Sequence, residues 1–150
     1  MKYFKPEELV GKKTFETMGE NSLSLFNPEV LIALDNLREY FNCPITVNNW
    51  HRGGIFQWRG YRTPEKAKEL GSEHSQHAFI FKNNIWIPKC NAFDCTINGY
   101  SAREVRAEII AHQDHELLKL ITRMEANTSW LHFDLMELPK DKQRIYLFRA

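Results

Sequence analysis

The chain has 150 residues, 43% of them hydrophobic, which is the size and composition of one globular domain with a single core. Its 20 lysines and arginines nearly balance its 19 aspartates and glutamates, and the net charge of +1 provides no field that would gather nucleic acid or an anionic membrane. We expect a single domain over 1–150, a monomer, with no nucleic-acid partner and no membrane insertion.

The N-terminal segment 1–26 is mixed in character and predicts at most a short helical turn over 6–10, followed by an irregular arm. It contains no apolar run of signal-peptide length, and no stretch of the chain approaches the roughly 18 apolar residues that span a bilayer. We therefore expect synthesis in the cytoplasm without a signal peptide. The three cysteines follow neither a disulfide framework nor a CxxC spacing, so we expect reduced thiols.

Start and stop signals are clear in the next part of the chain. Asn27 and Pro28 are typical of a helix N-cap and first helical position, and apolar residues recur at helical spacing from there. Thr63 and Gly71 are suited to the start and the end of a shorter helix. The elements expected here are a helix over 28–41, a β-rich strand over 44–50 and a helix over 64–70.

The second half alternates short apolar runs with turn residues. Lys82-Asn83-Asn84 and Pro88-Lys89 separate three such runs, which favours a hairpin and then a core strand. Ser101 and Glu104 form a capping-box pattern. The expected elements are strands at 79–81, 85–87, 92–97, 130–136 and 144–148, and a helix over 102–112, with 117–124 ambiguous. Together they predict an α+β fold with a small central, largely antiparallel sheet and flanking helices.

Two stretches gather residues that bind metals. The first, 72–97, contains His74, His77 and Asp94, and the second, SWLHFDL, contains His132 and Asp134. Residues two apart in a strand project from the same face, so His132 and Asp134 should share a polar face. A bare carboxylate such as Asp94 on a buried strand is costly unless it is paired or bound to a cation. Two imidazoles and one carboxylate are a usual set for catalytic zinc, and a structural salt bridge is the alternative.

The segments SQH at 75–77, NAFDCTI at 91–97 and SWLHFDL at 129–135 resemble the zinc peptidases that cut cell-wall peptides. These are the D-alanyl-D-alanine carboxypeptidases and the phage L-alanyl-D-glutamate endopeptidases, which share a fold with the Hedgehog signalling domain. Their signature is Ser-x-His, then Ala-x-Asp, and later Trp-x-His. The resemblance also includes PITVNNW and GYR and covers roughly 27–148.

The resemblance implies the roles of five residues. His77, Asp94 and His132 would be the ligands of a Zn²⁺ ion, Arg62 would hold a substrate carboxylate, and Ser75 would hydrogen-bond the substrate backbone. One departure concerns spacing: the family places its first His and its Asp seven apart, whereas here they are seventeen apart and the usual intervening Gly is missing. About ten extra residues, roughly 79–89, predict a hairpin insertion that a surface loop tolerates and that could cover the groove. His74 is the alternative ligand.

The other departure concerns the general base. Many members carry Glu or Asp three residues before the last His, but here that position is Ser129, which cannot take a proton from zinc-bound water. Glu125 is the nearest upstream carboxylate, and a hairpin around 127–129 would set it opposite Trp130, within reach of the open zinc position. Asp134 is the second candidate for the base, or it orients a ligand imidazole.

The expected function is that of a zinc-dependent peptidase that hydrolyses amide bonds in peptidoglycan stem peptides, of the D-Ala-D-Ala carboxypeptidase or L-Ala-D-Glu endopeptidase type. The resemblance and the absence of an export signal favour a phage or prophage lysin that reaches the cell wall after host lysis or from the virion. The alternative is a catalytically inactive binding or structural module on the same fold. A small globular protein without a metal is a third interpretation.

Overall fold

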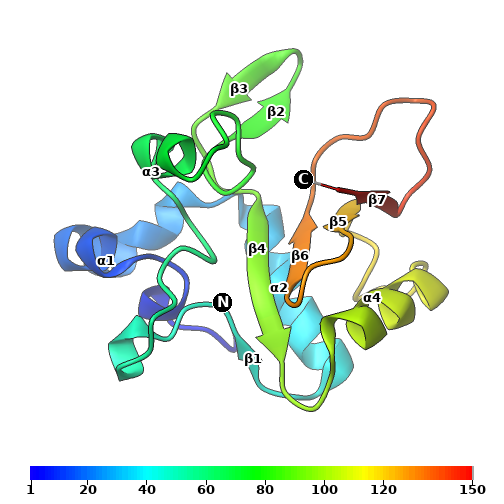
Figure 1. The fold of residues 1–150 in the computed structure, drawn as a ribbon, viewed down its shortest axis with the longest axis horizontal. Coiled ribbons are helices and arrows are strands. Elements are labelled where there is room, and N and C mark those ends of the chain that lie inside the picture. The colour runs from blue at the N-terminus through cyan, green and yellow to red at the C-terminus, as the bar shows by residue number, and fades with distance from the viewer. Residues whose placement is uncertain (150) are drawn as a thin grey trace.

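A central mixed sheet organises the residues that the computed structural model describes, 1–149. Its five strands are β1 (Ile45–Thr46), β4 (Ala92–Ile97), β5 (Arg123–Glu125), β6 (Leu131–Asp134) and β7 (Tyr146–Phe148), in the order β1-β4-β6-β5-β7 (Figure 1). β4 lies antiparallel to β1 and β6, β5 lies antiparallel to β6, and β7 joins β5 in parallel. With helices packed around this sheet, the predicted α+β class is confirmed.

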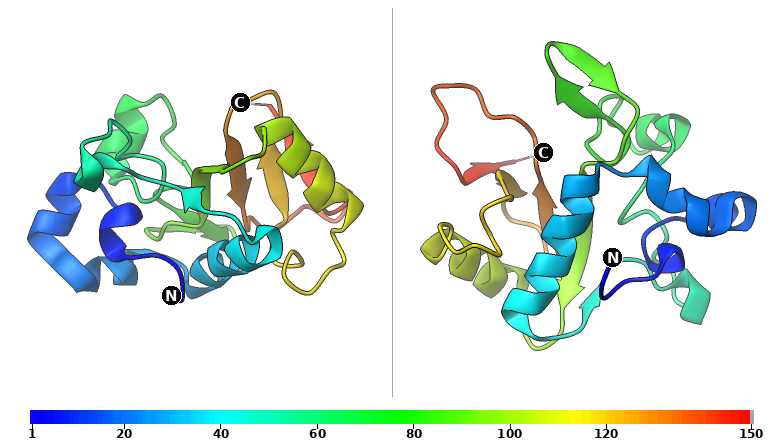
Figure 2. Two further views of the ribbon diagram at one scale, coloured as in Figure 1. Left: turned by 90° about the horizontal axis from the view of Figure 1, so that it is seen from below. Right: turned by 180° about the vertical axis from the view of Figure 1, so that it is seen from behind.

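The two longest helices begin and end close to where their capping signals predicted. In α2 (Pro28–Phe41), the side chain of Asn27 accepts a hydrogen bond from the backbone N–H of Glu29 at 3.2 Å. In α4 (Ala102–Ala111), Ser101 and Glu104 form the predicted capping box. Seen from behind, α2 crosses the back of the sheet over β4 (Figure 2). It therefore covers one sheet face, and α4 also packs against β4 and β6.

The side chains of β4 and β6 divide between these two faces. Phe93 and Phe133 are fully buried directly opposite each other and belong to the core, where Phe26 stacks on Phe93 with ring centroids 5.5 Å apart. Asp94 and His132 alternate with them and therefore point to the opposite face. Burial of the apolar face fixes the strand register, because a slip of one residue would exchange the two sets of side chains.

The N-terminal segment is more ordered than the sequence predicted. Instead of an irregular arm it forms η1 (Pro6–Glu8), α1 (Lys12–Met18) and η2 (Gly19–Leu25). No helical signal marked α1, because that helix has no side-chain cap and buries none of its residues. The core anchors the segment through Leu9 and Val10, which are fully buried.

The strand expected over 44–50 is shorter than predicted, since only β1 pairs with β4 and the chain then turns into η3 (Trp50–Arg52). Asn48 and Asn49 cause this change because their side-chain oxygens accept hydrogen bonds from the backbone N–H groups of the following loop, at 3.0 and 2.9 Å. These bonds join Asn48 and Asn49 to the loop over 56–59, so the chain leaves the strand here. The following helix, α3 (Pro64–Glu69), forms as predicted, with the Thr63 hydroxyl as its N-cap.

The predicted hairpin is confirmed. It consists of β2 (Ile80–Lys82) and β3 (Ile85–Ile87), which pair only with each other and project beside α3 (Figure 1). Asn83 and Asn84 connect them with φ values of 52° and 61°, as a tight primed turn requires. Among residues 1–149, no helix has the length and apolar character that crossing a membrane requires.

Candidate metal centre

Three residues that are far apart in the sequence meet on the sheet face opposite α2. Asp94 of β4 and His132 of β6 are direct cross-strand partners, and the loop after α3 brings His77 to them. One potential ligand atom of each residue lies within 4.8 Å of the others, and all three residues are buried. The structure thus brings together the three residues that the resemblance implied as ligands.

Asp94 is at the centre of the group. Its Oδ1 lies 2.8 Å from Nδ1 of His132 and 3.3 Å from Nε2 of His77, while its Oδ2 accepts a hydrogen bond from Nη2 of Arg62 at 2.7 Å. Burial alone would raise the pKa of this carboxyl, but the two histidines outweigh burial and hold the pKa well below its usual range. Asp94 is therefore an anion with one oxygen directed at both imidazoles.

His77 presents a lone pair to this oxygen. Its Nδ1 lies 2.8 Å from the carbonyl oxygen of Gly60, which can only accept, so Nδ1 carries the proton and Nε2 does not. Burial lowers the pKa of His77, which favours this neutral form. Nε2 is buried without a hydrogen-bond partner in the described part of the chain. A lone pair facing a carboxylate oxygen at 3.3 Å is unfavourable unless a cation lies between them, so these two residues fit a metal ion.

His132 is held between two carboxylates. Its Nδ1 faces Asp94, and its Nε2 lies 3.3 Å from Oδ2 of Asp134. Burial alone would lower the pKa of His132, but hydrogen bonds to Asp134 and Asp94 outweigh it and raise the pKa to about 9. A metal bound at Nδ1 would displace the proton there, while Asp134 would keep the one on Nε2.

Asp134 is in turn fixed by Arg123 and is fully buried. Nε and Nη2 of Arg123 donate to the carboxylate at 2.9 and 2.6 Å, and the backbone N–H of Met136 donates to it at 3.0 Å. Burial alone would raise the pKa of Asp134, but the hydrogen bonds with His132 and Arg123 outweigh burial and lower it. Because its oxygens are already occupied, Asp134 is suited to orienting His132 and poorly suited to accepting a proton from water.

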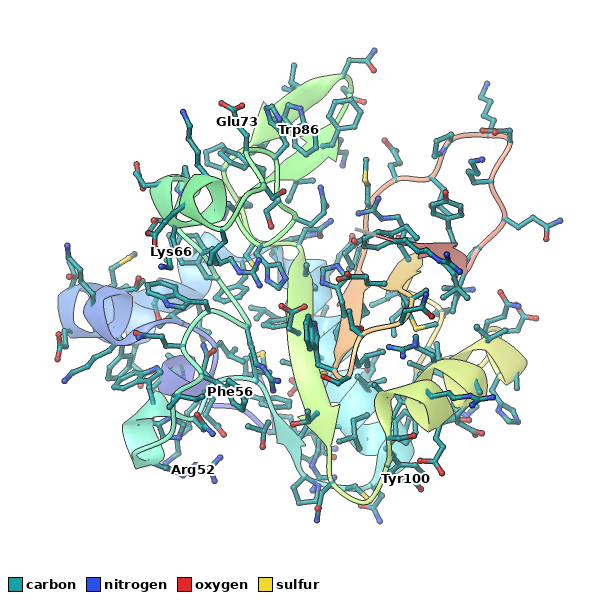
Figure 3. The ribbon with its side chains drawn as sticks, viewed as in Figure 1. Arg52, Phe56, Lys66, Glu73, Trp86 and Tyr100 are labelled. Carbon is teal, nitrogen blue, oxygen red and sulfur yellow. The ribbon has the colours of Figure 1, made fainter. Side chains whose placement is uncertain are left out.

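Two imidazole nitrogens and one carboxylate oxygen are donors that suit a divalent transition-metal ion with an open position. His74, the alternative ligand, lies outside the group of three: its exposed ring stacks on Trp86 of the hairpin at a centroid distance of 4.7 Å. The hairpin borders the site through Trp86, which is labelled in Figure 3. It supplies no ligand to the group of three.

A cavity of about 490 Å³ opens over the three residues. Arg62, Ser75 and Glu125 line it, as do Trp86 from the hairpin and Trp130 from the loop before β6. The insertion forms one of its walls, which agrees with the expectation that it could cover the groove. Its volume lies within the range of about 300–1,000 Å³ that is usual for ligand-binding pockets in proteins.

Arg62 and Ser75 both take part in local contacts. Besides binding Asp94, Arg62 donates through Nε to the carbonyl oxygen of Trp58 at 2.7 Å, which leaves the N–H groups of Nη1 and the second N–H of Nη2 for a substrate carboxylate. The hydroxyl of Ser75 accepts the N–H of His77 at 3.2 Å and keeps its own proton for a ligand. The structural salt bridge considered for Asp94 is thus present in the structure, and it orients this carboxylate.

Glu125 lies on the wall of the cavity, but the predicted register of its hairpin is wrong. The pair Met124↔Phe133 places Glu125 across from His132, whereas the sequence predicted that it would face Trp130. The loop between β5 and β6 is longer than expected; in it Asn127 has a φ of 66° and the Thr128 hydroxyl donates to the carbonyl oxygen of Trp130. Cross-strand neighbours on one face have Cβ atoms about 5 Å apart, so the observed register brings Glu125 close to the ligands.

Sequence reasoning missed Arg123 and the carbonyl oxygen of Gly60. Arg123 lies at the end of the stretch whose secondary structure was ambiguous, and its pairing with Asp134 depends on a strand register that no local pattern indicates. Gly60 belongs to the GYR segment, which the resemblance had singled out only for its arginine. In comparisons with known proteins, no protein-family model, curated protein or solved structure matches this chain.

Proposed function

We propose that this chain is a zinc-dependent peptidase that hydrolyses amide bonds in peptidoglycan stem peptides. The observation that carries the proposal is the buried trio of His77, Asp94 and His132 at the base of a cavity, with Glu125 on its wall. The SQH, AFD and WLH segments that contain the trio are those that resemble the cell-wall peptidases. The peptide substrate is proposed on that resemblance alone.

His77, Asp94 and His132 would hold the zinc ion, which would supply a lowered pKa for water, from 15.7 to about 7, and polarisation of a substrate carbonyl. Glu125 would accept a proton from the attacking water and return it to the leaving amine. Asp134 would hold the proton of His132 on Nε2, which leaves Nδ1 free for the metal. The carbonyl oxygen of Gly60 would hold the proton of His77 on Nδ1, which leaves Nε2 free. Each ligand thus has its own orienting partner.

The substrate of such an enzyme carries free carboxylates, which require a cation in the groove. Arg62 and Arg123 both line the cavity. Each already binds a carboxylate of the protein, at 2.7 and 2.6 Å, so their remaining guanidinium nitrogens are what a ligand would meet. Arginine is suited to this double use because its planar group has five donors. By the same resemblance, we extend the proposal to a lysin of phage or prophage origin that acts at the cell wall.

One observation favours a second candidate, a non-catalytic module that binds cell-wall peptides. Ser129 occupies the position of the family's general base and lies exposed on the loop before β6, so it supplies no acid–base group. If Glu125 does not replace that base, the cavity would still bind a metal and a peptide. The two candidates differ in hydrolysis and agree in metal content.

The test has two stages. Elemental mass spectrometry of protein purified without a metal-affinity tag is expected to give about one zinc per chain, lost in His132→Ala and Asp94→Ala and retained in the control His112→Ala, an exposed histidine outside the trio. Digestion of purified peptidoglycan, followed by chromatography of the fragments, is then expected to fall at least 100-fold in Glu125→Gln. The exposed Glu116→Gln is the matched control.

Zinc without hydrolysis in the wild-type protein would favour the binding module. A wild-type protein that holds no zinc and cannot be loaded with it would refute both candidates, because both depend on the metal.

A further inference from the structure

A chain of three side-chain amides leads from the start of α2 to the wall of the metal cavity. Nδ2 of Asn27 donates to Oδ1 of Asn91 at 2.8 Å, and Nδ2 of Asn91 donates to Oε1 of Gln76 at 3.0 Å. Asn27 and Asn91 line a separate cavity, whereas Gln76 lines the metal cavity, as do its sequence neighbours Ser75 and His77. The chain therefore ends at the site.

The direction of every amide in this chain is determined by its first member. The backbone N–H of Glu29 can only donate, and it donates to the side-chain oxygen of Asn27. Asn27 must then present its NH₂ group to Asn91, which must accept with its oxygen and donate with its own NH₂ group. Gln76 receives that donation on Oε1, so its NH₂ group is the end of the chain.

This terminal NH₂ group has no partner. Gln76 is only 5% exposed, and its Nε2 is buried with no hydrogen-bond acceptor among residues 1–149. Its backbone is also held, because its carbonyl oxygen accepts the N–H of Asn91 at 2.7 Å. Roughly nine in ten buried polar groups in proteins are paired, so an unpaired donor that is fixed in place beside a cavity calls for a ligand atom.

We propose that Gln76 is a substrate-binding residue whose Nε2–H donates a hydrogen bond to a carbonyl oxygen of the peptide, and that Asn27 and Asn91 position it. The peptide class rests on the proposed function. An amide that must donate selects an acceptor. Gln76 and the hydroxyl of Ser75 are neutral donors of the cavity, whereas Arg62 and Arg123 are cationic donors. Peptide carbonyl oxygens are the neutral acceptors that every peptide substrate carries.

The direction of the chain allows a test that leaves the residues lining the metal cavity unchanged. In Asn91→Asp, position 91 can accept from Asn27 but cannot donate to Gln76. The amide of Gln76 would then turn to donate to the new carboxylate and present its oxygen to the cavity. Gln76→Glu removes the same donor directly while keeping an oxygen that accepts from Asn91. Both variants should therefore weaken the same ligand contact.

The experiment measures the binding of two peptides, N-acetyl-D-alanyl-D-alanine and N-acetyl-L-alanyl-D-glutamate, to the zinc-loaded protein by calorimetry. For at least one peptide we expect the dissociation constant to rise about 3- to 10-fold in Gln76→Glu and in Asn91→Asp, the range of one net hydrogen bond. The exposed Gln143→Glu adds the same charge and should bind like wild type. Zinc content, measured in every sample, should stay the same, which a general loss of structure would not allow.

Unchanged binding in Gln76→Glu overturns the inference, as does failure of the wild-type protein to bind either peptide. If Asn91→Asp does not fold, Gln76→Glu alone decides. Hydrolysis is measured separately, so the two proposals are distinguishable. If binding depends on Gln76 and no hydrolysis is found, this inference is supported and the peptidase is refuted. If hydrolysis is found and binding does not depend on Gln76, the peptidase is supported and this inference is refuted.

Discussion

The stability of the metal-free protein should fall as the pH rises from 7.0 to 8.5, because His132 is protonated in the folded state. Its pKa is raised from 6.5 to about 9, since Asp134 and Asp94 stabilise the imidazolium. A raised pKa contributes stability that is complete below the unfolded-state value and is lost as the pH passes the folded-state value. The full shift corresponds to about 3 kcal/mol, of which about 2 kcal/mol should be lost between pH 7.0 and 8.5.

The neighbouring groups should contribute little to this loss. Asp94 and Asp134 have lowered pKa values and stay ionised throughout the window. His77 has a lowered pKa, so it is neutral when folded and increasingly neutral when unfolded above pH 6.5. Bound zinc should remove the loss, because the metal replaces the proton at Nδ1 of His132 and binds more tightly as the pH rises.

The assay is thermal unfolding, with a chelator or with excess zinc, at pH 7.0 and 8.5. For a domain of this size, about 2 kcal/mol corresponds to a decrease in Tm of roughly 4–8 °C in the metal-free protein. Zinc at 100 times its dissociation constant should add about 2.7 kcal/mol of stability. The control His112→Ala should follow the wild-type curve. If the Tm of the metal-free protein is constant or increases over this window, the argument from His132 is wrong.

Three further predictions follow from contacts around the site and in the core. Asp134→Asn should weaken zinc binding about 10- to 100-fold, measured by competition with a fluorescent chelator, because His132 loses the partner that fixes its tautomer. Gly60→Ala should destabilise the fold by about 1–3 kcal/mol or more in urea titrations, because a Cβ there would overlap the carbonyl oxygen of Leu9; a wild-type midpoint would contradict this packing. Phe93→Ala should cost about 3–5 kcal/mol in the same titrations, since the ring is fully buried against Phe26 and Phe133.

Elements with strong local signals were predictable from the sequence. The helix over 28–41 has a cap, a proline at its first position and regular apolar spacing, and α2 occupies the same residues. The hairpin has an Asn-Asn turn, whose two residues both adopt positive φ. By contrast, α1 lacks a side-chain cap and buried residues, so nothing in its sequence distinguished it from an irregular arm.

The candidate site was predictable in its residue types and not in its network. His77, Asp94 and His132 stand in recognisable motifs, and the alternation of β4 and β6 places the last two on one face. The contacts that orient them join residues far apart in sequence, as in the Arg62–Asp94 pair, and no local pattern encodes such pairings. The position of Glu125 was wrong because hairpin register depends on loop length, which single residues such as Asn127 change.

The origin of the three proposed ligands has a consequence for metal exchange. Asp94 and His132 are paired residues of neighbouring strands, so the backbone ladder of the sheet holds their separation. His77 comes from a loop. Its ring N–H donates to the carbonyl oxygen of Gly60, and its carbonyl oxygen accepts the backbone N–H of Arg62. A metal ion would therefore be bound by two residues whose separation the sheet holds, Asp94 and His132, and by one residue on a loop, His77. Loading and release should each begin at His77, and ions of different radius should be accommodated by that side of the centre while the strands stay fixed.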